Sequence, residues 1–150
     1  MTESCLVHGT AVAIEGRAVL LRGPPGSGKS DLALRLIDAG AQLVADDQTE
    51  LARVGDRIVA RPPATIVGLI EVRGIGILRL DPVMEAPVAL FADLVQPETV
   101  ERLPMPRLER VLGLDLPLLA LGPFEASATA KLRLALRVYA EAGFPALLKT

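Results

Sequence analysis

Residues 23–30 read GPPGSGKS and fit the phosphate-binding pattern G-x-x-x-x-G-K-S over its whole length. In such a loop, backbone N–H groups point at phosphate oxygens, and the N-terminus of the following helix adds partial positive charge. Lys29 can reach the β- and γ-phosphates, and the hydroxyl of Ser30 can take a position on Mg²⁺. The alternative is a glycine-rich turn that binds nothing. An apolar strand before the motif and a helix after it favour binding of ATP or a similar phosphate by Gly23, Pro24, Pro25, Gly26, Ser27, Gly28, Lys29 and Ser30.

Two neighbouring acids, Asp46 and Asp47, follow Lys29 by 17 and 18 residues. Two carboxylates beside a polyphosphate need a metal ion or a lysine to neutralise their charge. One of them could hold water on Mg²⁺ while the other takes a proton from an incoming hydroxyl. They point to opposite faces if the strand persists, so they should not share one role. The alternative is a pair of capping acids at the end of a strand.

The run LIEVRGIGIL contains Glu71, whose carboxylate would be costly to bury without a partner. We interpret residues 65–80 as a strand in which Glu71 and Arg73 point to one face. Glu71 would then face Mg²⁺ and Arg73 would face phosphate. The alternative is a structural ion pair between the two. Gly74 and Gly76 would let a ligand or backbone come close.

Residues 11–14 and 18–22 are apolar and flank Glu15-Gly16, which predicts a β-hairpin. Gly16 supplies the positive φ that a tight turn needs. If the loop is the two residues Glu15 and Gly16, then Ile14 lies opposite Arg17 and the numbers of paired residues sum to 31.

This register predicts the position of His8, the single histidine of the sequence. His8 would lie across from Gly23, the first residue of the phosphate loop, and a bulge at Gly9 could shift the pairing by one residue. In either case we expect His8 beside the phosphate loop. The alternative is a structural histidine.

After the loop, residues 30–40 have apolar side chains at helical spacing and end in Gly40, which predicts a helix. The apolar run 41–45 follows as a strand. A strand–helix–strand unit is right-handed and parallel, so both strands end at the same edge of the sheet. Ligands of open α/β sheets bind outside that edge. We therefore expect Asp46 and Asp47 at the phosphate site.

The remaining elements follow from similar patterns. A second hairpin is expected around Gly55-Asp56, and the run 107–113 is interpreted as a solvated helix face. A last helix is expected over 123–143, with Pro123 in its first turn, an apolar stripe and Gly143 at its end. The second hairpin spans 49–62, further strands are expected at 87–95 and 116–121, and the stripe consists of Leu132, Leu136 and Tyr139. The antiparallel N-terminal hairpin beside a parallel unit predicts an α/β domain with a mixed β-sheet.

Composition bounds the possible functions. The chain has 150 residues, 51% of them apolar and 3% aromatic, with a formal net charge of −2. One domain spanning residues 1–150 is the expectation for this length. The absence of a basic field and the few aromatic residues argue against nucleic acid as a partner. A single cysteine, Cys5, no secretion signal and no long apolar run predict a cytoplasmic protein without a membrane span.

Four stretches together resemble the bacterial HPr kinase/phosphorylase family. They are HGTAVAI (8–14), GPPGSGKS (23–30), LVADD (43–47) and EVRGIGIL (71–78), in the family's order and spacing. The EVRG element is the most specific of the four, because ordinary P-loop proteins do not carry it. The resemblance covers residues 6–80 well and is faint afterwards.

The resemblance implies a P-loop kinase domain of the type shared with phosphoenolpyruvate carboxykinases. It implies transfer of the γ-phosphoryl group of ATP, with Mg²⁺, to a serine of the phosphocarrier HPr or a paralogue, and assembly into a homo-oligomer, a hexamer in the family. It assigns phosphate clamping to Lys29, the general base to the Asp46/Asp47 pair, and an assisting role to His8. The candidate catalytic residues are thus His8, Lys29, Asp46, Asp47, Arg73 and Arg110, and the candidate metal ligands are Ser30, Glu71 and Asp47. We expect the phosphate loop, both aspartates and Glu71 around one divalent ion.

Two features depart from the family pattern. Family members commonly carry an additional N-terminal domain, so the sequence resembles a truncated form. The family's basic Pro-Gly-Arg loop, tied to reverse phosphorolysis, should lie near 117–127, where this chain reads PLLALGPFEAS without arginine. We therefore expect kinase activity, and the reverse reaction has no support in the sequence.

Two other functions compete with this interpretation. A small-molecule kinase could use the same loop, with residues 96–113 as its lid. A nucleotide-binding module could sense ATP without transferring phosphate.

Overall fold

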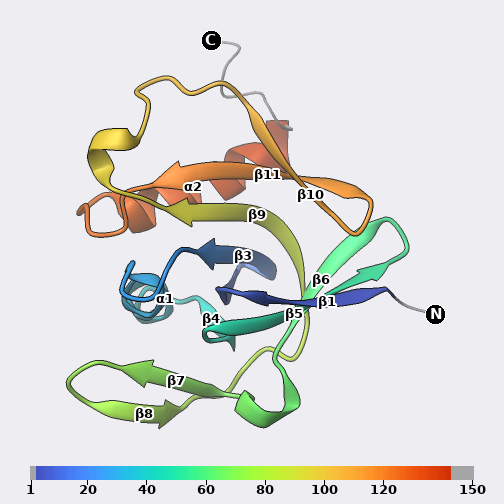
Figure 1. Cartoon of the computed structure of the whole chain (residues 1–150), viewed down its shortest axis with the longest axis vertical. Coiled ribbons are helices and arrows are strands. Elements are labelled where there is room, and N and C mark those ends of the chain that lie inside the picture. The colour runs from blue at the N-terminus through green and yellow to red at the C-terminus, as the bar shows by residue number, and fades with distance from the viewer. Residues whose placement is uncertain (1–2, 143–150) are drawn as a thin grey trace.

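The structure is a computed structural model, and it describes residues 3–142 (Figure 1). The elements of the phosphate-loop region are β1 (Ser4–His8), β2 (Thr10–Ile14), β3 (Arg17–Arg22), α1 (Lys29–Asp38) and β4 (Gln42–Ala45). The elements of the middle region are β5 (Gln48–Val54), β6 (Arg57–Arg61), the 3-10 helix η1 (Ala64–Ile66), β7 (Leu69–Val72) and β8 (Gly76–Arg79). The last elements are β9 (Ala86–Leu94), the 3-10 helix η2 (Pro97–Thr99), β10 (Arg107–Val111), β11 (Leu114–Leu121) and α2 (Ala128–Ala142).

Among residues 3–142, the main sheet has nine strands and branches at β9. Its continuous path is β1-β5-β6-β9-β3-β2-β4, and β11 also pairs with β9 and carries β10 at its outer edge. Strand β9 runs parallel to β3 and to β11, whereas the other pairs in this sheet are antiparallel. The predicted mixed sheet is therefore confirmed.

The N-terminal hairpin has the predicted register. Ile14 lies opposite Arg17 and Thr10 opposite Leu21, so the paired numbers sum to 31. Glu15 and Gly16 both have positive φ, at 52° and 81°, as a two-residue turn with the right-handed twist of the strands requires.

The parallel unit is also confirmed. Helix α1 connects β3 to β4, and both of these strands run antiparallel to β2, which lies between them. The two therefore run in the same direction and end at the same edge of the sheet. The helix buries Leu32 and Leu36. It ends at Asp38, two residues before Gly40, which has a φ of 110°.

The two faces of the sheet bury separate apolar clusters. Side chains alternate along each strand, so Val19 and Leu21 of β3 face the helices while Ala18 and Leu20 face the curl formed by β5 and β6. Helices α1 and α2 contribute Leu36 and Leu132, among others, to the first cluster. Leu132 and Leu136 of the predicted stripe are buried, and Tyr139 packs partly against the same cluster. The helices thus pack against one face of β3, the strand that leads into the phosphate loop.

Two predicted elements were wrong, and a third has a different start. The expected strand 65–80 is a hairpin of β7 and β8, which forms a separate two-stranded sheet and which Figure 1 shows at the opposite end of the molecule from β10 and β11. The chain reverses at residues 73–75, because Gly74 and Gly76 adopt φ values of 90° and 125° that other residues rarely take.

The expected helix face at 107–113 is instead strand β10 and its turn into β11, where Leu112 and Gly113 both have positive φ. The expected last helix begins at Ala128 rather than at Pro123, since residues 122–127 form turns. Gly143, its predicted end, lies outside the described residues. Neither helix of residues 3–142 has the length and apolar character that crossing a bilayer requires.

Candidate active site

The phosphate loop connects β3 to α1 at the carboxyl edge of β3. Gly26 and Gly28 have φ values of 82° and 103°, a region that side chains rarely allow. Gly28 is also the N-cap of α1, without a side-chain cap, so the amides of the first helical turn remain available to an anion. The local backbone is therefore the one that a phosphate cradle needs.

The interior of the loop is occupied by its own polar groups. Lys29 is 8% exposed, and its Nζ donates hydrogen bonds to the carbonyls of Gly23 (2.6 Å) and Pro24 (3.2 Å). The hydroxyl of Ser27 is buried without a hydrogen-bond partner among the described residues, and a Cβ on Gly23 would lie 2.4 Å from it. Buried polar groups normally have partners, so an orphaned hydroxyl beside an ammonium fits a site for phosphate oxygens. Phosphate entry would draw Lys29 away from the carbonyls.

Asp46 connects the loop to the rest of the site. Its Oδ1 accepts hydrogen bonds from the hydroxyls of Ser30 (2.7 Å) and Thr10 (3.0 Å), and its Oδ2 accepts one from the backbone N–H of Glu71 (3.1 Å). Asp46 is 8% exposed. One carboxylate therefore joins three segments that are distant in the sequence.

Asp47 differs from Asp46 in the exposure and the hydrogen bonding of its carboxylate. Its side chain is exposed and accepts no hydrogen bond from the described residues. Its backbone is held on both sides, since its N–H donates to Thr10 Oγ1 (3.0 Å) and its carbonyl accepts from the N–H of Gly9 (2.9 Å). Its φ of 68° lies in the left-handed region, which Asp tolerates better than most residues. Strand β4 ends at Ala45, before both acids, so the prediction that they point to opposite faces of a continuing strand does not apply.

The β7–β8 hairpin brings Glu71 to the site by its backbone. Its side chain is exposed, and so is that of Arg73, which lies in the turn after β7. No ion pair joins the two among the described residues, so the alternative of a structural pair was wrong. The expectation that both point to one face of a single strand was also wrong, because the strand ends at Val72.

His8 lies elsewhere than the hairpin register predicted. It ends β1 and pairs with Gln48 of β5, not with Gly23. The strands separate at Gly9, which is buried so closely that a Cβ there would lie 2.9 Å from the carbonyl oxygen of Leu21. His8 is exposed, and its neighbours connect it to the site: the N–H of Gly9 donates to the carbonyl of Asp47, and Gln48, its partner on β5, follows Asp47.

Arg110 is exposed on β10, and its hydrogen bond within the described residues goes to Asp115 of β11 (3.1 Å). The structure gives it no contact with the phosphate loop.

Within the described part of the chain, side chains alone do not form a metal centre. In residues 3–142, no three acidic, histidine or cysteine side chains come together as metal ligands, so the expected cluster of Asp46, Asp47 and Glu71 is not formed. The donor set nevertheless suits Mg²⁺, which prefers oxygen ligands and is usually held by few protein groups together with phosphates and water. The Ser30 hydroxyl backed by the Asp46 carboxylate is such a partial oxygen site.

Sequence reasoning missed two features of the site. Thr10 is fully buried in β2 and contacts both acids; a lone hydroxyl in an apolar strand was its only signal. Arg22, at the end of β3, hydrogen-bonds Asp93 through Nε (2.8 Å) and contacts Glu109 of β10. Partial burial lowers the pKa of Arg22, but the hydrogen bonds and charges of Asp93 and Glu109 outweigh it, so this pKa is raised. Nothing in the spacing of these residues predicts their contact.

Together, a phosphate loop at the carboxyl edge of a mixed sheet and an acid bonded to its serine define a P-loop kinase-like domain. The HPr Serine kinase C-terminal domain family matches residues 1–86. The chain also resembles the Hpr(Ser) kinase/phosphatase from Coxiella burnetii, with a TM-score of 0.80 and 28% identity over 91% of this chain and 96% of that one. This chain belongs to the HPr serine kinase C-terminal domain family, as the motifs predicted.

Proposed function

We infer that the protein is an HPr serine kinase, a phosphotransferase that moves the γ-phosphoryl group of ATP to a serine of HPr or a paralogue. Family membership supports the class of enzyme. The observation that carries the chemistry is the pairing of Ser30 with the buried Asp46, while Asp47 presents a free carboxylate beside them. A site built this way can hold a polyphosphate and still accept a proton.

The residues divide the work of transfer between them. Phosphoryl transfer depends mainly on positioning and on neutralising charge at the transferred group. The loop amides and Lys29 hold the phosphates, and each well-placed donor of this kind is typically worth about 3 kcal/mol of transition-state stabilisation. Asp47 is the candidate general base for the serine hydroxyl, because its carboxylate is exposed and unengaged. Asp46 positions Ser30 and the β7 backbone.

The proposal includes Mg²⁺ held by the hydroxyl of Ser30. Asp46 would hold that hydroxyl by its hydrogen bond, and Glu71 or Asp47 would contact water ligands of the ion. When bound, Mg²⁺ neutralises developing charge on the phosphates. Arg73, in the turn after β7, and Arg110 remain candidates for contact with phosphate. His8 remains a candidate assistant beside Asp47.

The finer properties also belong to the proposal. The protein would act in the cytoplasm as a homo-oligomer, a hexamer by resemblance to the family, with no nucleic acid or membrane partner. The turn at 122–127 carries no arginine, which supports a kinase rather than the reverse phosphorolysis.

Incubation with ATP labelled at the γ position tests the proposal against its rivals. With purified HPr present, we expect label on an HPr serine. Label on a small metabolite would instead indicate a small-molecule kinase, and ATP binding without transfer to any acceptor would indicate a sensing module. Either result would overturn the proposal. An HPr variant with its acceptor serine changed to alanine is the matched control.

A further inference from the structure

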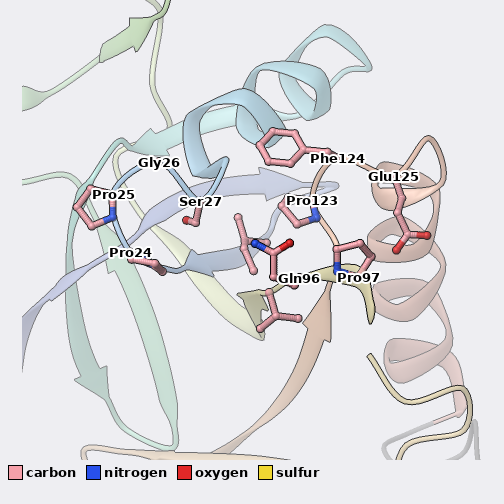
Figure 2. A pocket seen from close by; sticks show the side chains of 11 residues that line it. Pro24, Pro25, Gly26, Ser27, Gln96, Pro97, Pro123, Phe124 and Glu125 are labelled. Carbon is pink, nitrogen blue, oxygen red and sulfur yellow. The ribbon is translucent and has the colours of Figure 1, made fainter. Parts of the chain in front are cut away.

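A cavity of about 540 Å³ opens beside the phosphate loop, on the side away from the acids. Figure 2 shows its three walls: the loop itself (24–27), the end of β9 with the following turn (94–97), and the turn before α2 (123–125). Its size lies in the range of small-ligand sites. Because Pro24 to Ser27 line both the cradle and the cavity, a ligand whose phosphates fill the loop extends directly into this space.

The order of the strands indicates which end of a bound nucleotide would face the cavity. The strands run β9-β3-β2-β4, and the loop leaves β3. Asp46 follows β4 on one side, whereas the cavity lies at the carboxyl ends of β9 and β11 on the other. A triphosphate with its γ end toward the acids therefore directs the rest of the nucleotide toward the cavity.

The cavity offers a flat aromatic surface at its upper wall. Phe124 is 69% exposed, an unusual state for a phenylalanine, and its ring packs against Gly28, where a Cβ would lie 2.8 Å from the ring. Figure 2 shows this ring directed toward the start of α1. Most of the ring is thus free, and bases stack readily on exposed aromatic rings.

The walls are braced and carry polar groups. The guanidinium of Arg35 on α1 donates a hydrogen bond to the carbonyl of Pro123, and the N–H of Val95 donates to the carbonyl of Leu121 (2.9 Å). The exposed side-chain amide of Gln96 lies among the lining groups, as does the carboxylate of Glu125. A glutamine amide offers a donor and an acceptor side by side, which matches the edge of adenine.

We propose that this cavity binds the adenine base of ATP, with Phe124 as its stacking surface and Gln96 at its edge. The inference rests on the proposed function for the identity of the triphosphate. The cavity would select a nucleotide over simple phosphates, a discrimination that the phosphate loop alone cannot make.

The test compares ATP with inorganic pyrophosphate, which fills the phosphate loop but has no base. In the 150-residue chain, Phe124→Ala should weaken ATP binding about tenfold, within the range for loss of one base–aromatic stack, and change pyrophosphate binding less than about twofold. Leu103→Ala removes another exposed apolar side chain, 78% exposed against 69% for Phe124, and should change neither. Equal weakening of both ligands would mean that Phe124 only shapes the loop, and no weakening would mean that the base lies elsewhere; both overturn the proposal.

A spectroscopic readout is available because the chain contains no tryptophan. Phe124→Trp should restore ATP affinity and introduce a single fluorophore whose emission changes with ATP but not with pyrophosphate. An identical response to both ligands would contradict stacking. If the wild-type protein binds ATP in this way but phosphorylates no protein, the proposed function fails while the base site stands. If Phe124→Ala leaves ATP affinity intact in an active kinase, the base site alone fails.

Discussion

The hydroxyl of Ser30 donates a 2.7 Å hydrogen bond to Oδ1 of Asp46, which is almost completely buried. This bond joins the start of α1 to the end of β4, two points 16 residues apart. Thr10 and the backbone of Glu71 complete the set of donors to the same carboxylate. These contacts give Asp46 a structural role, and the proposed function adds a role in phosphoryl transfer, so the two can be measured separately.

Asp46→Asn should destabilise the protein and slow transfer. An amide group offers one acceptor oxygen, so its NH₂ would face a backbone or hydroxyl donor and leave it unsatisfied. We expect the free energy of unfolding to fall by about 1–3 kcal/mol, the usual cost of such a mismatch at a buried site. Urea denaturation monitored by circular dichroism checks this. An unchanged unfolding midpoint would show that the three hydrogen bonds contribute nothing.

Asp47→Asn should leave stability unchanged and slow transfer. The side chain is exposed, and asparagine tolerates the left-handed backbone at this position, so the free energy of unfolding should change by less than about 0.5 kcal/mol. Loss of a general base typically costs about a hundredfold to ten-thousandfold in rate. The measurement is the rate of label transfer to HPr at saturating ATP, with Asp56→Asn, an exposed turn acid, as control. If neither aspartate variant slows transfer, the account of these acids is wrong.

Local rules predicted the centre of the fold well. The turn at Glu15-Gly16 sets the register of β2 and β3, and the short helix α1 returns the chain in parallel, so Asp46 arrives beside Ser30 as expected. These features depend on positive-φ turn chemistry and on the handedness of one strand–helix–strand unit. Both act over a few residues and are therefore visible in the sequence.

The failures have a common physical cause, since each depends on where a strand stops pairing. His8 lies on β1 because the close approach of Gly9 to Leu21 separates two strands that looked continuous. Arg73 lies in a turn because Gly74 reverses the chain, although the apolar pattern continues on both sides. Long-range contacts such as that of Arg22 with Asp93 arise only when β3 and β9 pair.

Glu71→Gln should raise the Mg²⁺ concentration needed for half-maximal transfer by several fold. The carboxylate is exposed at the edge of the site, and its own N–H fixes its backbone to Asp46, so the side chain is free to act on a bound cation. Removing one negative charge from an oxygen-donor site weakens the binding of a hard cation such as Mg²⁺. Titration of activity with MgCl₂ at constant ATP measures the effect. Mg²⁺ dependence identical to that of wild type would exclude Glu71 from the metal site.

Lys29→Ala should abolish transfer while preserving the fold. In the structure its Nζ bonds to the carbonyls of Gly23 and Pro24, both in a partly exposed loop that water can reach, so these carbonyls lose little when the lysine is removed. The phosphates, in contrast, lose their only loop cation, and loss of such a group typically slows reaction about a hundredfold or more. The assay is label transfer to HPr, with unfolding midpoints recorded in parallel and Arg57→Ala, an exposed cation on β6, as control. A variant that keeps more than about a tenth of the wild-type rate would refute the assignment of residues 23–30 as the catalytic phosphate site, because no other predicted residue can replace the charge of Lys29 inside the loop.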